Sequence, residues 1–319
     1  MNTAKLGIVA LGLTLATTAA ISQTPTWLPP AEKDRCPSKW GAADQRGSAN
    51  HVKPASILKA AQMIKTGEMI ELAHVLNDKM PFFGTRRFDM HIKRTFLNQP
   101  ANKRGSNEEI VISEIGQVGT QFDGFAHQSH EDSLYNCNKI SEIAGRTGFT
   151  KLGIHQVGTI MSRGVMIDVA AYKGVATLPD TYEITVEDLE GALKKQGTTL
   201  QPGDAILINT GWHKLWAVDN ARYVKSCPGI GLGAAQWLIA KDPVLLGADN
   251  WPVEVSPNPD PMISLPVHQL ALVVHGVHLL ENLKLDDLAA KQVYEFAFMM
   301  QPMKMQGASG STVAPVAVR

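Results

Sequence analysis

The sequence is poor in cysteine and in aromatic residues, and it has no excess of charge of either sign. Its 319 residues include three cysteines, 6% aromatic residues, and 30 Lys+Arg against 30 Asp+Glu. Three cysteines are too few for a disulfide-rich scaffold, and no CxxC or Cys/His spacing indicates a zinc finger. A formal net charge of zero argues against a nucleic-acid-binding protein that works through a broad basic surface. The 44% of hydrophobic residues predicts a globular chain with a sizeable core, most simply an enzyme.

After the N-terminus the sequence also lacks any apolar run long enough to span a membrane. Residues 1–22 have Lys5 as their only charge, then the apolar segment Leu6 to Leu15, then small residues up to Ser22. This pattern is typical of a secretory signal peptide, and the apolar segment is shorter than the roughly 20 residues of a transmembrane helix. An uncleaved anchor is the alternative. We expect a secreted or periplasmic protein that has no membrane contact after cleavage.

If the protein is exported, its three cysteines lie in a compartment where a disulfide can form. Cys36, Cys137 and Cys227 are an odd set, so at most one intramolecular disulfide can form in an oxidising compartment. The sequence does not choose the pair. None of the three has flanking residues that would activate a nucleophile, so we expect structural or free cysteines rather than a catalytic one.

The mature chain divides into an N-terminal arm over residues 23–47 and a domain over residues 48–319. Expected strands alternate with expected helices along the domain, which predicts a layered α/β fold. The expected strands cover residues 69–75, 109–115, 164–168, 204–209, 244–247 and 277–283. The expected helices cover residues 54–65, 233–240 and 268–274, and a further one starts at Thr185. No repeat or linker divides the domain.

The densest group of polar side chains follows the expected strand at residues 109–115. It runs from Gln117 to His130 as QVGTQFDGFAHQSH, with amide, carboxylate and imidazole groups two to four residues apart. If the strand continues, Gln117, Gln121 and Asp123 point to one face and can converge on a metal or a polarised carbonyl. A polar turn at a strand end is the alternative.

A second group begins at His268, on an expected helix that ends at Gly276 and is followed by an apolar strand. Glu281 lies among the apolar residues of that strand. An acid is costly to bury there unless it is paired or bound to a metal, so we expect Glu281 to have a functional role. His275 and His278 are better explained as histidines that are satisfied at the surface or in the core.

Two familiar motifs are incomplete. Gly229 to Ala234 fits the G-x-G-x-x-A pattern of dinucleotide-binding folds, but the segment follows Ser226-Cys-Pro rather than a strand. It therefore predicts the start of a helix and no nucleotide site. The segment from Gly310 to Ala314 lacks the last glycine of a G-x-S-x-G elbow, which argues against a serine hydrolase of that type.

Taken together and in this order, the two polar groups resemble the putative cyclase family of metal-dependent hydrolases, which includes kynurenine formamidase and isatin hydrolase. The family motif H-x-x-x-H-x-D-x-x-x-H, with its Gly-Thr and a distant His and Glu, is matched in position by Gln117, Gln121, Asp123, His127, His268 and Glu281. The likeness covers most of the mature chain. It implies a single swivelling β/β/α-type domain, a small-molecule substrate, and a homodimer or homotetramer.

The chain departs from the family motif at three positions. Gln117 and Gln121 stand where the family has histidine ligands, and Phe125 replaces its proline. A glutamine offers a carbonyl oxygen where imidazole offers nitrogen, so the ligand set that the resemblance implies is rich in oxygen. That set comprises Gln117, Gln121, Asp123, His268 and Glu281. It suits Mn²⁺ better than a three-histidine site would, with Zn²⁺ as the alternative.

The resemblance implies an amidohydrolase, lactonase or arylformamidase that cleaves a small cyclic or aryl substrate with metal-activated water. His127 matches the family's catalytic histidine and would act as the general base. Four side chains near the motifs are expected to line the substrate pocket: Phe125, His130, Trp212 and Trp251. Phe122 is better explained as a core residue. The two glutamines leave a second function open, an exported small-molecule-binding protein on the same fold with no turnover.

Overall fold

The computed structural model describes Met1, residues 25–96 and residues 101–319. Apart from Met1, the expected signal peptide at residues 1–22 lies outside the described residues. In the part of the chain that is described, every helix is too short or too polar to cross a bilayer.

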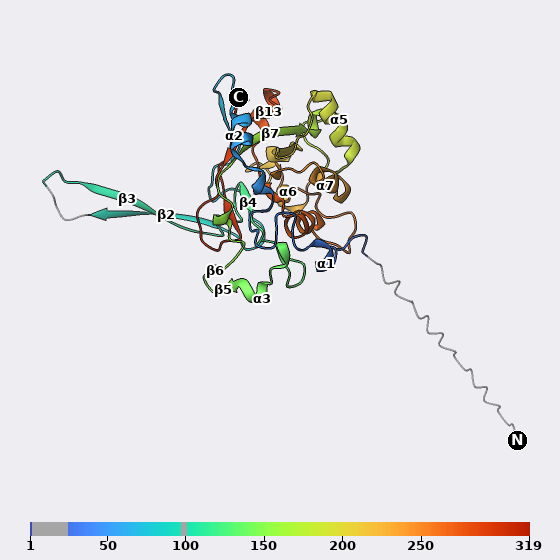
Figure 1. Cartoon of the computed structure of the whole chain (residues 1–319). Coiled ribbons are helices and arrows are strands. Elements are labelled where there is room, and N and C mark those ends of the chain that lie inside the picture. Colours follow the sequence, from blue (N-terminus) through green and yellow to red (C-terminus); the bar gives the residue numbers. More distant parts are fainter. Residues whose placement is uncertain (2–24, 97–100) are drawn as a thin grey trace.

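A nine-stranded mixed sheet forms the centre of the molecule (Figure 1). In spatial order its strands are β1 (Met69–Glu71), β15 (Val316–Val318), β13 (Glu295–Met300), β7 (Ile160–Asp168), β9 (Ala205–Asn209), β11 (Leu245–Ala248), β12 (His278–Glu281), β4 (Gln121–Asp123) and β14 (Gly310–Thr312). The four strands β7, β9, β11 and β12 are parallel to their neighbours in this group, and the flanking pairings are antiparallel. The α/β fold expected from the sequence is confirmed.

The core lies on both faces of the sheet because its central strands are buried along their length and carry apolar side chains on both faces. Ile206 and Ile208 of β9 belong to one buried cluster, while Ala205 and Leu207 belong to the other, as the two-residue period of a strand requires. The first cluster includes side chains of α5 (Val186–Gln196), α7 (Leu232–Ile239) and the π-helix η5 (Gln269–His275). The second includes α9 (Asp286–Ala290).

The helices begin and end close to where the sequence predicts them. Thr185 caps α5 and accepts a hydrogen bond from the Asp188 N–H at 3.4 Å, and the helix ends at Gly197, which has a left-handed backbone. The helix expected over 54–65 is α2 (Pro54–Ala61), which ends four residues earlier. The remaining helices are α1 (Glu32–Arg35), α3 (Ile140–Ile143), α4 (Val169–Lys173), α6 (Asn220–Lys225), α8 (Pro266–His268) and the 3₁₀ turns η1 (Gly47–His51), η2 (Tyr135–Cys137), η3 (Ile154–Gln156) and η4 (Trp212–Leu215).

One pair of strands departs from the expected pattern. β2 (Phe88–Phe96) and β3 (Gly105–Ser113) form a two-stranded hairpin that projects from the body (Figure 1), whereas the sequence predicts one strand at 109–115. The alternating apolar residues that suggest a half-buried strand belong here to an exposed ribbon. Two more two-residue pairings complete the strands: β5 (Ala144–Gly145) with β6 (Gly148–Phe149), and β8 (Glu183–Ile184) with β10 (Gly229–Ile230).

The N-terminal arm is fastened to the domain by a disulfide. Cys36 is bonded to Cys137, 101 residues further along the chain, and Cys227 is free and buried. Beside the disulfide, the Arg35 guanidinium donates to the Ser133 hydroxyl at 2.7 Å. The expectation of at most one intramolecular bridge is confirmed, and the structure supplies the pair.

Candidate functional site

The two polar groups of the sequence meet because β4 and β12 are antiparallel neighbours in the sheet. Gln121 lies opposite Glu281, and Asp123 lies opposite Leu279. The four residues alternate along their strands, so the side chains of Gln121, Asp123 and Glu281 share the face that carries η5. This pairing could not be read from the sequence, in which the two groups are about 160 residues apart.

The strand expected to run into the motif does not continue. β3 ends at Ser113, a turn follows, and β4 contains only Gln121 to Asp123. Gly119 breaks the extended chain with φ +66°, and its Cα lies against Leu76, whose side chain would collide with any added Cβ. The prediction of one continuous face from Gln117 to Asp123 is therefore wrong, although Gln117 still reaches Gln121.

His268 is held in a defined orientation by Glu254. The N–H groups of Val267 and His268 donate to the Glu254 carboxylate at 3.0 and 2.9 Å, and His268 Nδ1 lies 2.7 Å from Glu254 Oε1. The opposite ring nitrogen, Nε2, lies 3.1 Å from Glu281 Oε1 and 3.6 Å from Asp123 Oδ2. A carboxylate behind a histidine is the usual way in which a metal-ligating imidazole is oriented.

Glu254 is a functional residue that sequence reasoning missed. It is fully buried between Pro252 and Ser256, with no polar motif around it. The signal available in the sequence was the acid itself, since a carboxylate flanked by Val253 and Val255 is as unusual as Glu281 among its leucines. The backbone of Glu254 is held by close packing against Gly229, where an added Cβ would collide with it.

His127 completes the group from the other side. Its Nε2 lies 3.8 Å from Asp123 Oδ2, and its side chain is 16% exposed, whereas that of Asp123 is 0% exposed. Burial lowers the pKa of His127 below its usual value, opposed by the nearby Asp123 carboxylate. The imidazole is therefore neutral at pH 7 and can accept a proton or a metal.

Gln121 uses its amide nitrogen rather than its carbonyl oxygen toward the acidic group. Its Nε2 donates to Glu281 Oε2 at 2.6 Å and, more weakly, to Gln117 Oε1 at 3.4 Å. The strand register places the charged Glu281 carboxylate directly opposite, and that is the strongest acceptor within reach. In this structure the Gln121 amide nitrogen therefore supports Glu281, while carbonyl ligation by Gln117 or Gln121 stays a prediction.

The Asp123 carboxylate is the unsatisfied member of the group. It is 0% exposed, and neither of its oxygens accepts a hydrogen bond from the described residues. A buried, unpaired carboxylate is costly, and the ordinary solution is a bound cation. Burial and the neighbouring Asp123 charge also raise the pKa of Glu281. Burial alone would lower the pKa of His268, but its contacts with Glu254 and Glu281 outweigh burial and raise it.

The distances fit a divalent metal. Within the described residues, one ligand atom each of Asp123, His127 and His268 lies within 4.8 Å of the other two. Ligand atoms about 2.1 Å from a tetrahedral metal lie about 3.4 Å apart. The distances of 3.6 and 3.8 Å from Asp123 Oδ2 to the two histidine nitrogens are close to that value. The oxygen and imidazole donors suit Mn²⁺ or Zn²⁺.

A small aromatic-walled cavity adjoins the acidic group. Its lining includes Gln117, Gln121 and Glu281, and its free volume of about 10 Å³ holds about one water molecule. Trp251, expected at the substrate pocket, lines it with Phe83, and the two ring centroids are 4.4 Å apart. Arg86, which sequence reasoning missed, also lines it and donates to the Gln117 carbonyl at 3.2 Å.

Three expected pocket residues lie elsewhere. Phe125 is 1% exposed and is packed between the rings of Tyr135 and His278, at 4.5 and 4.1 Å. Trp212 is fully buried, and its indole N–H donates to the Tyr223 carbonyl at 3.2 Å. His130 sits in a turn and does not line the cavity. None of the three lines the small cavity, and Trp212 packs behind its wall in the cluster that includes Phe83 and Trp251.

Two other expectations for buried residues are confirmed. Phe122 is fully buried in the core. His278 is fully buried too, with its Nδ1 2.9 Å from the Asp123 carbonyl, so it is a satisfied core histidine.

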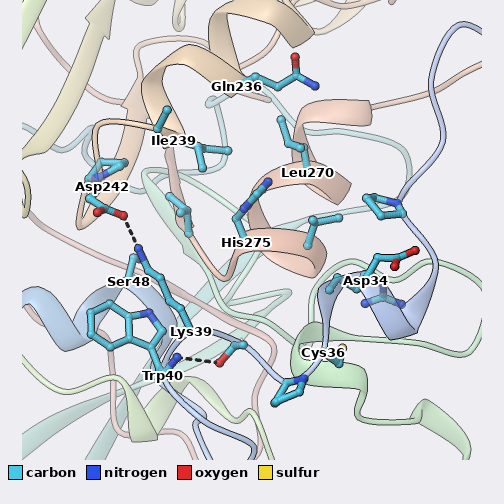
Figure 2. Close-up of a pocket in the computed structure, with 18 of the residues that line it drawn as sticks. Asp34, Cys36, Lys39, Trp40, Ser48, Gln236, Ile239, Asp242, Leu270 and His275 are labelled. Carbon is cyan, nitrogen blue, oxygen red and sulfur yellow. Dashed lines mark hydrogen bonds and ion pairs between the residues drawn. The ribbon is translucent and has the colours of Figure 1, made fainter.

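A cavity of about 780 Å³ lies between the N-terminal arm, α7 and η5 (Figure 2). Lys39, Trp40, Asp242 and His275 line it, and Lys39 forms an ion pair with Asp242. None of the expected site residues lines this cavity. Of the two cavities, only the smaller one is lined by expected site residues, namely Gln117, Gln121, Trp251 and Glu281.

Comparison with known proteins gives a consistent result. The family described as "Putative cyclase" matches residues 70–255. The crystal structure of a protein described as a novel cyclase is 34% identical in sequence, covers 88% of this chain and 98% of its own, and superposes with a TM-score of 0.80. No curated protein matches the chain.

Two isatin hydrolases share the fold. Isatin hydrolase A from Ralstonia solanacearum is 21% identical, with a TM-score of 0.57 over 84% of this chain and 98% of its own. Isatin hydrolase A from Labrenzia aggregata is 19% identical, with a TM-score of 0.57 over 81% and 94%. At these identities the likeness concerns the fold alone.

Proposed function

The chain belongs to the putative cyclase family, and from this membership and the geometry of the Asp123 group we propose that it is a metal-dependent hydrolase. The observation that carries the proposal is the buried Asp123 carboxylate, which makes no hydrogen bond and faces two histidine nitrogens. The substrate we propose is a small cyclic or aryl molecule with an amide or lactone bond. The names of the isatin hydrolases that share the fold support this class.

Asp123, His268 and Glu281 would hold the metal, with Mn²⁺ favoured and Zn²⁺ as the alternative. A metal bound there supplies Lewis-acid polarisation of a carbonyl and a water of lowered pKa. Glu254 fixes the ring of His268 so that Nε2 faces the site, and Gln121 fixes Glu281 through a 2.6 Å hydrogen bond. These two residues position ligands rather than binding the metal themselves.

His127 is the general base in this proposal. Its Nε2 lies at a ligand-like distance from Asp123, but we assign His127 to proton transfer because it is the most exposed of Asp123, His127 and His268 and its imidazole is neutral at pH 7. It would take the proton of the attacking water and return it to the leaving nitrogen or oxygen. Phe83 and Trp251 would pack against the apolar part of the substrate, because their rings form the wall beside Glu281.

We also propose that the protein is exported and works as a homo-oligomer in a periplasmic or extracellular space. The disulfide between Cys36 and Cys137 supports export, since such bridges persist in oxidising compartments. The first 22 residues supply the matching signal-peptide pattern.

Metal content and turnover test the proposed function together. The mature protein would be stripped with a chelator, reloaded with Mn²⁺ or Zn²⁺, and assayed on N-formyl arylamines, isatin and lactones. We expect turnover of one class that depends on the metal. A protein that binds neither metal and hydrolyses nothing would refute the proposal, while one that binds metal and isatin without turnover would favour the binding-protein alternative.

The role of His127 is tested separately. We expect His127→Ala to lower turnover by about 10²–10⁴-fold, the usual contribution of a general base, while the metal content stays at the wild-type level. Elemental analysis of the purified variant measures the metal. If His127→Ala loses the metal, the imidazole is a ligand and not the base.

A further inference from the structure

We propose that Arg86 selects substrates that carry a carboxylate, so that the preferred substrate is a small cyclic or aryl amide or lactone with a negative charge. The inference rests on the proposed function and names the substrate class of that same site. Three observations carry it: the position of Arg86 on the cavity wall, the N–H donors that its side chain leaves unused, and the aromatic residue on the same turn.

Arg86 brings a positive charge to the cavity beside Glu281. Its side chain is half-buried and lines this cavity together with Gln117, Gln121 and Glu281. Among the described residues that line the cavity, Arg86 is the one cation and Glu281 is the one acid. A cation on the wall of a substrate cavity favours a ligand of opposite charge, and it does so more strongly where water is partly excluded.

The guanidinium of Arg86 has donors that no protein group uses. Its Nη1 donates to the Gln117 carbonyl at 3.2 Å, and within the described part of the chain the side chain forms no ion pair, not even with Glu281. Nε and Nη2 therefore have no acceptor there. These two nitrogens form one edge of the planar guanidinium, the edge that binds a carboxylate through two parallel hydrogen bonds.

The neighbouring Arg87 shows what an arginine without this role does. Its Nε lies 3.3 Å from Asp89 Oδ2, and its side chain is 61% exposed, so it forms an ordinary ion pair at the surface. Arg86, one residue earlier, is less exposed and has no such partner. A charge that is partly desolvated and unpaired is costly, and a bound carboxylate would compensate that cost.

The charge of Arg86 also reaches the groups that we assign to catalysis. Burial is the main cause of the lowered pKa of His127, and the Arg86 charge lowers it further. Burial and the Asp123 charge raise the pKa of Glu281, and the Arg86 charge partly opposes them. The guanidinium is thus within electrostatic range of the proposed base and of a proposed ligand, so one small substrate can contact all three.

Arg86 and the aromatic wall of the cavity belong to one turn. The Arg86 N–H donates to the Phe83 carbonyl at 3.2 Å, and the Phe83 ring lies 4.4 Å from that of Trp251. With these rings together the cavity has a free volume of only about 10 Å³. A substrate ring can therefore enter only when Phe83 moves away from Trp251, and the turn carries Arg86 with it. The ring and the carboxylate of the substrate would meet the same turn.

The first arm of the test compares turnover of charged and neutral substrates. Wild type, Arg86→Gln and Arg87→Gln, each loaded with Mn²⁺, would be assayed on formanilide and on its ring carboxylates, the formamidobenzoates. We expect a higher kcat/KM for a formamidobenzoate than for formanilide, and we expect Arg86→Gln to reduce this preference by about tenfold to a hundredfold. Arg87→Gln is the matched control and should keep the wild-type preference. Arg86→Lys keeps the charge but loses the two-nitrogen edge, so it should keep only part of the preference.

The second arm measures the same contact without turnover. Calorimetry gives the dissociation constants of benzoate and of benzamide, its neutral counterpart, for the same metal-loaded proteins, and elemental analysis confirms equal metal content. We expect Arg86→Gln to remove most of the preference for benzoate and Arg87→Gln to keep it. A protein that shows this change but hydrolyses no substrate would contradict the proposed function while supporting carboxylate selection by Arg86.

Two results would overturn the inference. If Arg86→Gln lowers kcat/KM equally for formanilide and for the formamidobenzoates, Arg86 acts on the carbonyl that both share and does not select a charge. If benzoate binds Arg86→Gln as tightly as it binds the wild type, the metal or another group holds the carboxylate. In either case turnover by the wild type would leave the proposed function standing.

Discussion

At the scale of single residues, the unusual feature of the site is a carboxylate buried without a hydrogen bond. Asp123 is 0% exposed beside the equally enclosed Glu281 and His268. In the metal-free protein this charge lowers the free energy of unfolding, because no hydrogen bond from the described residues compensates its desolvation. In our proposal the same charge is a metal ligand in the loaded protein. Asp123 therefore lowers the stability of the metal-free protein and raises its affinity for metal. A substitution can separate the two effects.

We predict that Asp123→Asn stabilises the metal-free protein by about 1–3 kcal/mol, the usual cost of one unsatisfied buried group. The same variant should lose the stabilisation that added Mn²⁺ gives to the wild type. Thermal unfolding with and without metal measures both. Asp204→Asn is the matched control, since Asp204 is buried but paired with Arg163 at 2.9 Å, and its loss should destabilise. Destabilisation by both variants would contradict the assignment.

His74 is a buried histidine that we expect to make the free energy of unfolding depend on pH. Its ring stacks on Trp216 with centroids 4.1 Å apart, its Nε2 is buried without a hydrogen bond, and burial lowers its pKa from 6.5 to about 4. The unfolded chain takes up a proton on this histidine below pH 6.5, but the folded chain does so only near pH 4. Stability due to neutral His74 is therefore complete above pH 6.5 and is lost as pH falls toward 4.

We predict that His74→Gln flattens the decline in unfolding free energy between pH 6.5 and 4 by about 2 kcal/mol, allowing for the partial exposure of the ring. Urea titrations at several pH values give the two curves. His91→Gln, which removes an exposed histidine of β2, is the matched control for the loss of one histidine. A His74→Gln curve parallel to that of the wild type would show that His74 does not titrate in this window.

At the scale of elements, the turn before β4 decides where the ligands stand. Gly119 has φ +66°, it is crowded by Leu76, and its carbonyl accepts a hydrogen bond from the Asn282 amide at 2.9 Å. Asn282 follows Glu281, and Tyr223 donates to it at 2.7 Å. The turn thus connects strand β4, which carries Gln121 and Asp123, to strand β12, which carries Glu281.

We predict that Gly119→Ala costs about 2–4 kcal/mol of stability, from backbone strain and the collision with Leu76 together, and weakens metal binding at least tenfold. Gly174→Ala is the control, because Gly174 has φ +72° but open space around it, so only strain of about 1 kcal/mol applies. Chemical denaturation and metal titration by calorimetry measure the two effects. Equal losses in both variants would show that the crowding at Gly119 has no consequence.

The elements also show which parts of the structure a sequence can predict. The strand at 204–209, the helix capped by Thr185 and the roles of Phe122 and His278 follow from local patterns, and the structure has them. The hairpin was missed because alternation indicates one covered face without saying what covers it. Glu254 and Arg86 were missed because the contacts that give them a role come from distant segments.

At the scale of the whole molecule, the disulfide ties the N-terminal arm to the domain. It closes a loop across 101 residues, for which the loop-entropy estimate is about 4.7 kcal/mol. We predict that Cys36→Ala together with Cys137→Ala lowers the unfolding free energy by about 2–5 kcal/mol and that a reducing agent does the same to the wild type. The reducing agent should leave the double variant unchanged, since Cys227 is buried and unbonded. Equal stability of oxidised and reduced wild type would contradict this.

The family resemblance predicted the fold of the whole molecule and the residues that meet at its centre. It could do so because it compares the order and spacing of motif positions along the chain, and not only the side chains at those positions. The consequence of the two glutamines had to come from the structure. Gln121 faces Glu281 with its amide nitrogen, so in our proposal it supports a metal ligand at a position where the resemblance implies a ligand. The register between β4 and β12 determines that contact, and neither strand's sequence contains it.

The most direct test of the account is an anomalous-diffraction map of crystals loaded with Mn²⁺, recorded on either side of an absorption edge of the metal. The account predicts a peak in contact with the Asp123 carboxylate and His268 Nε2, with Glu281 in the same shell. A peak bound elsewhere, or an empty Asp123 group in crystals of metal-saturated protein, would contradict it.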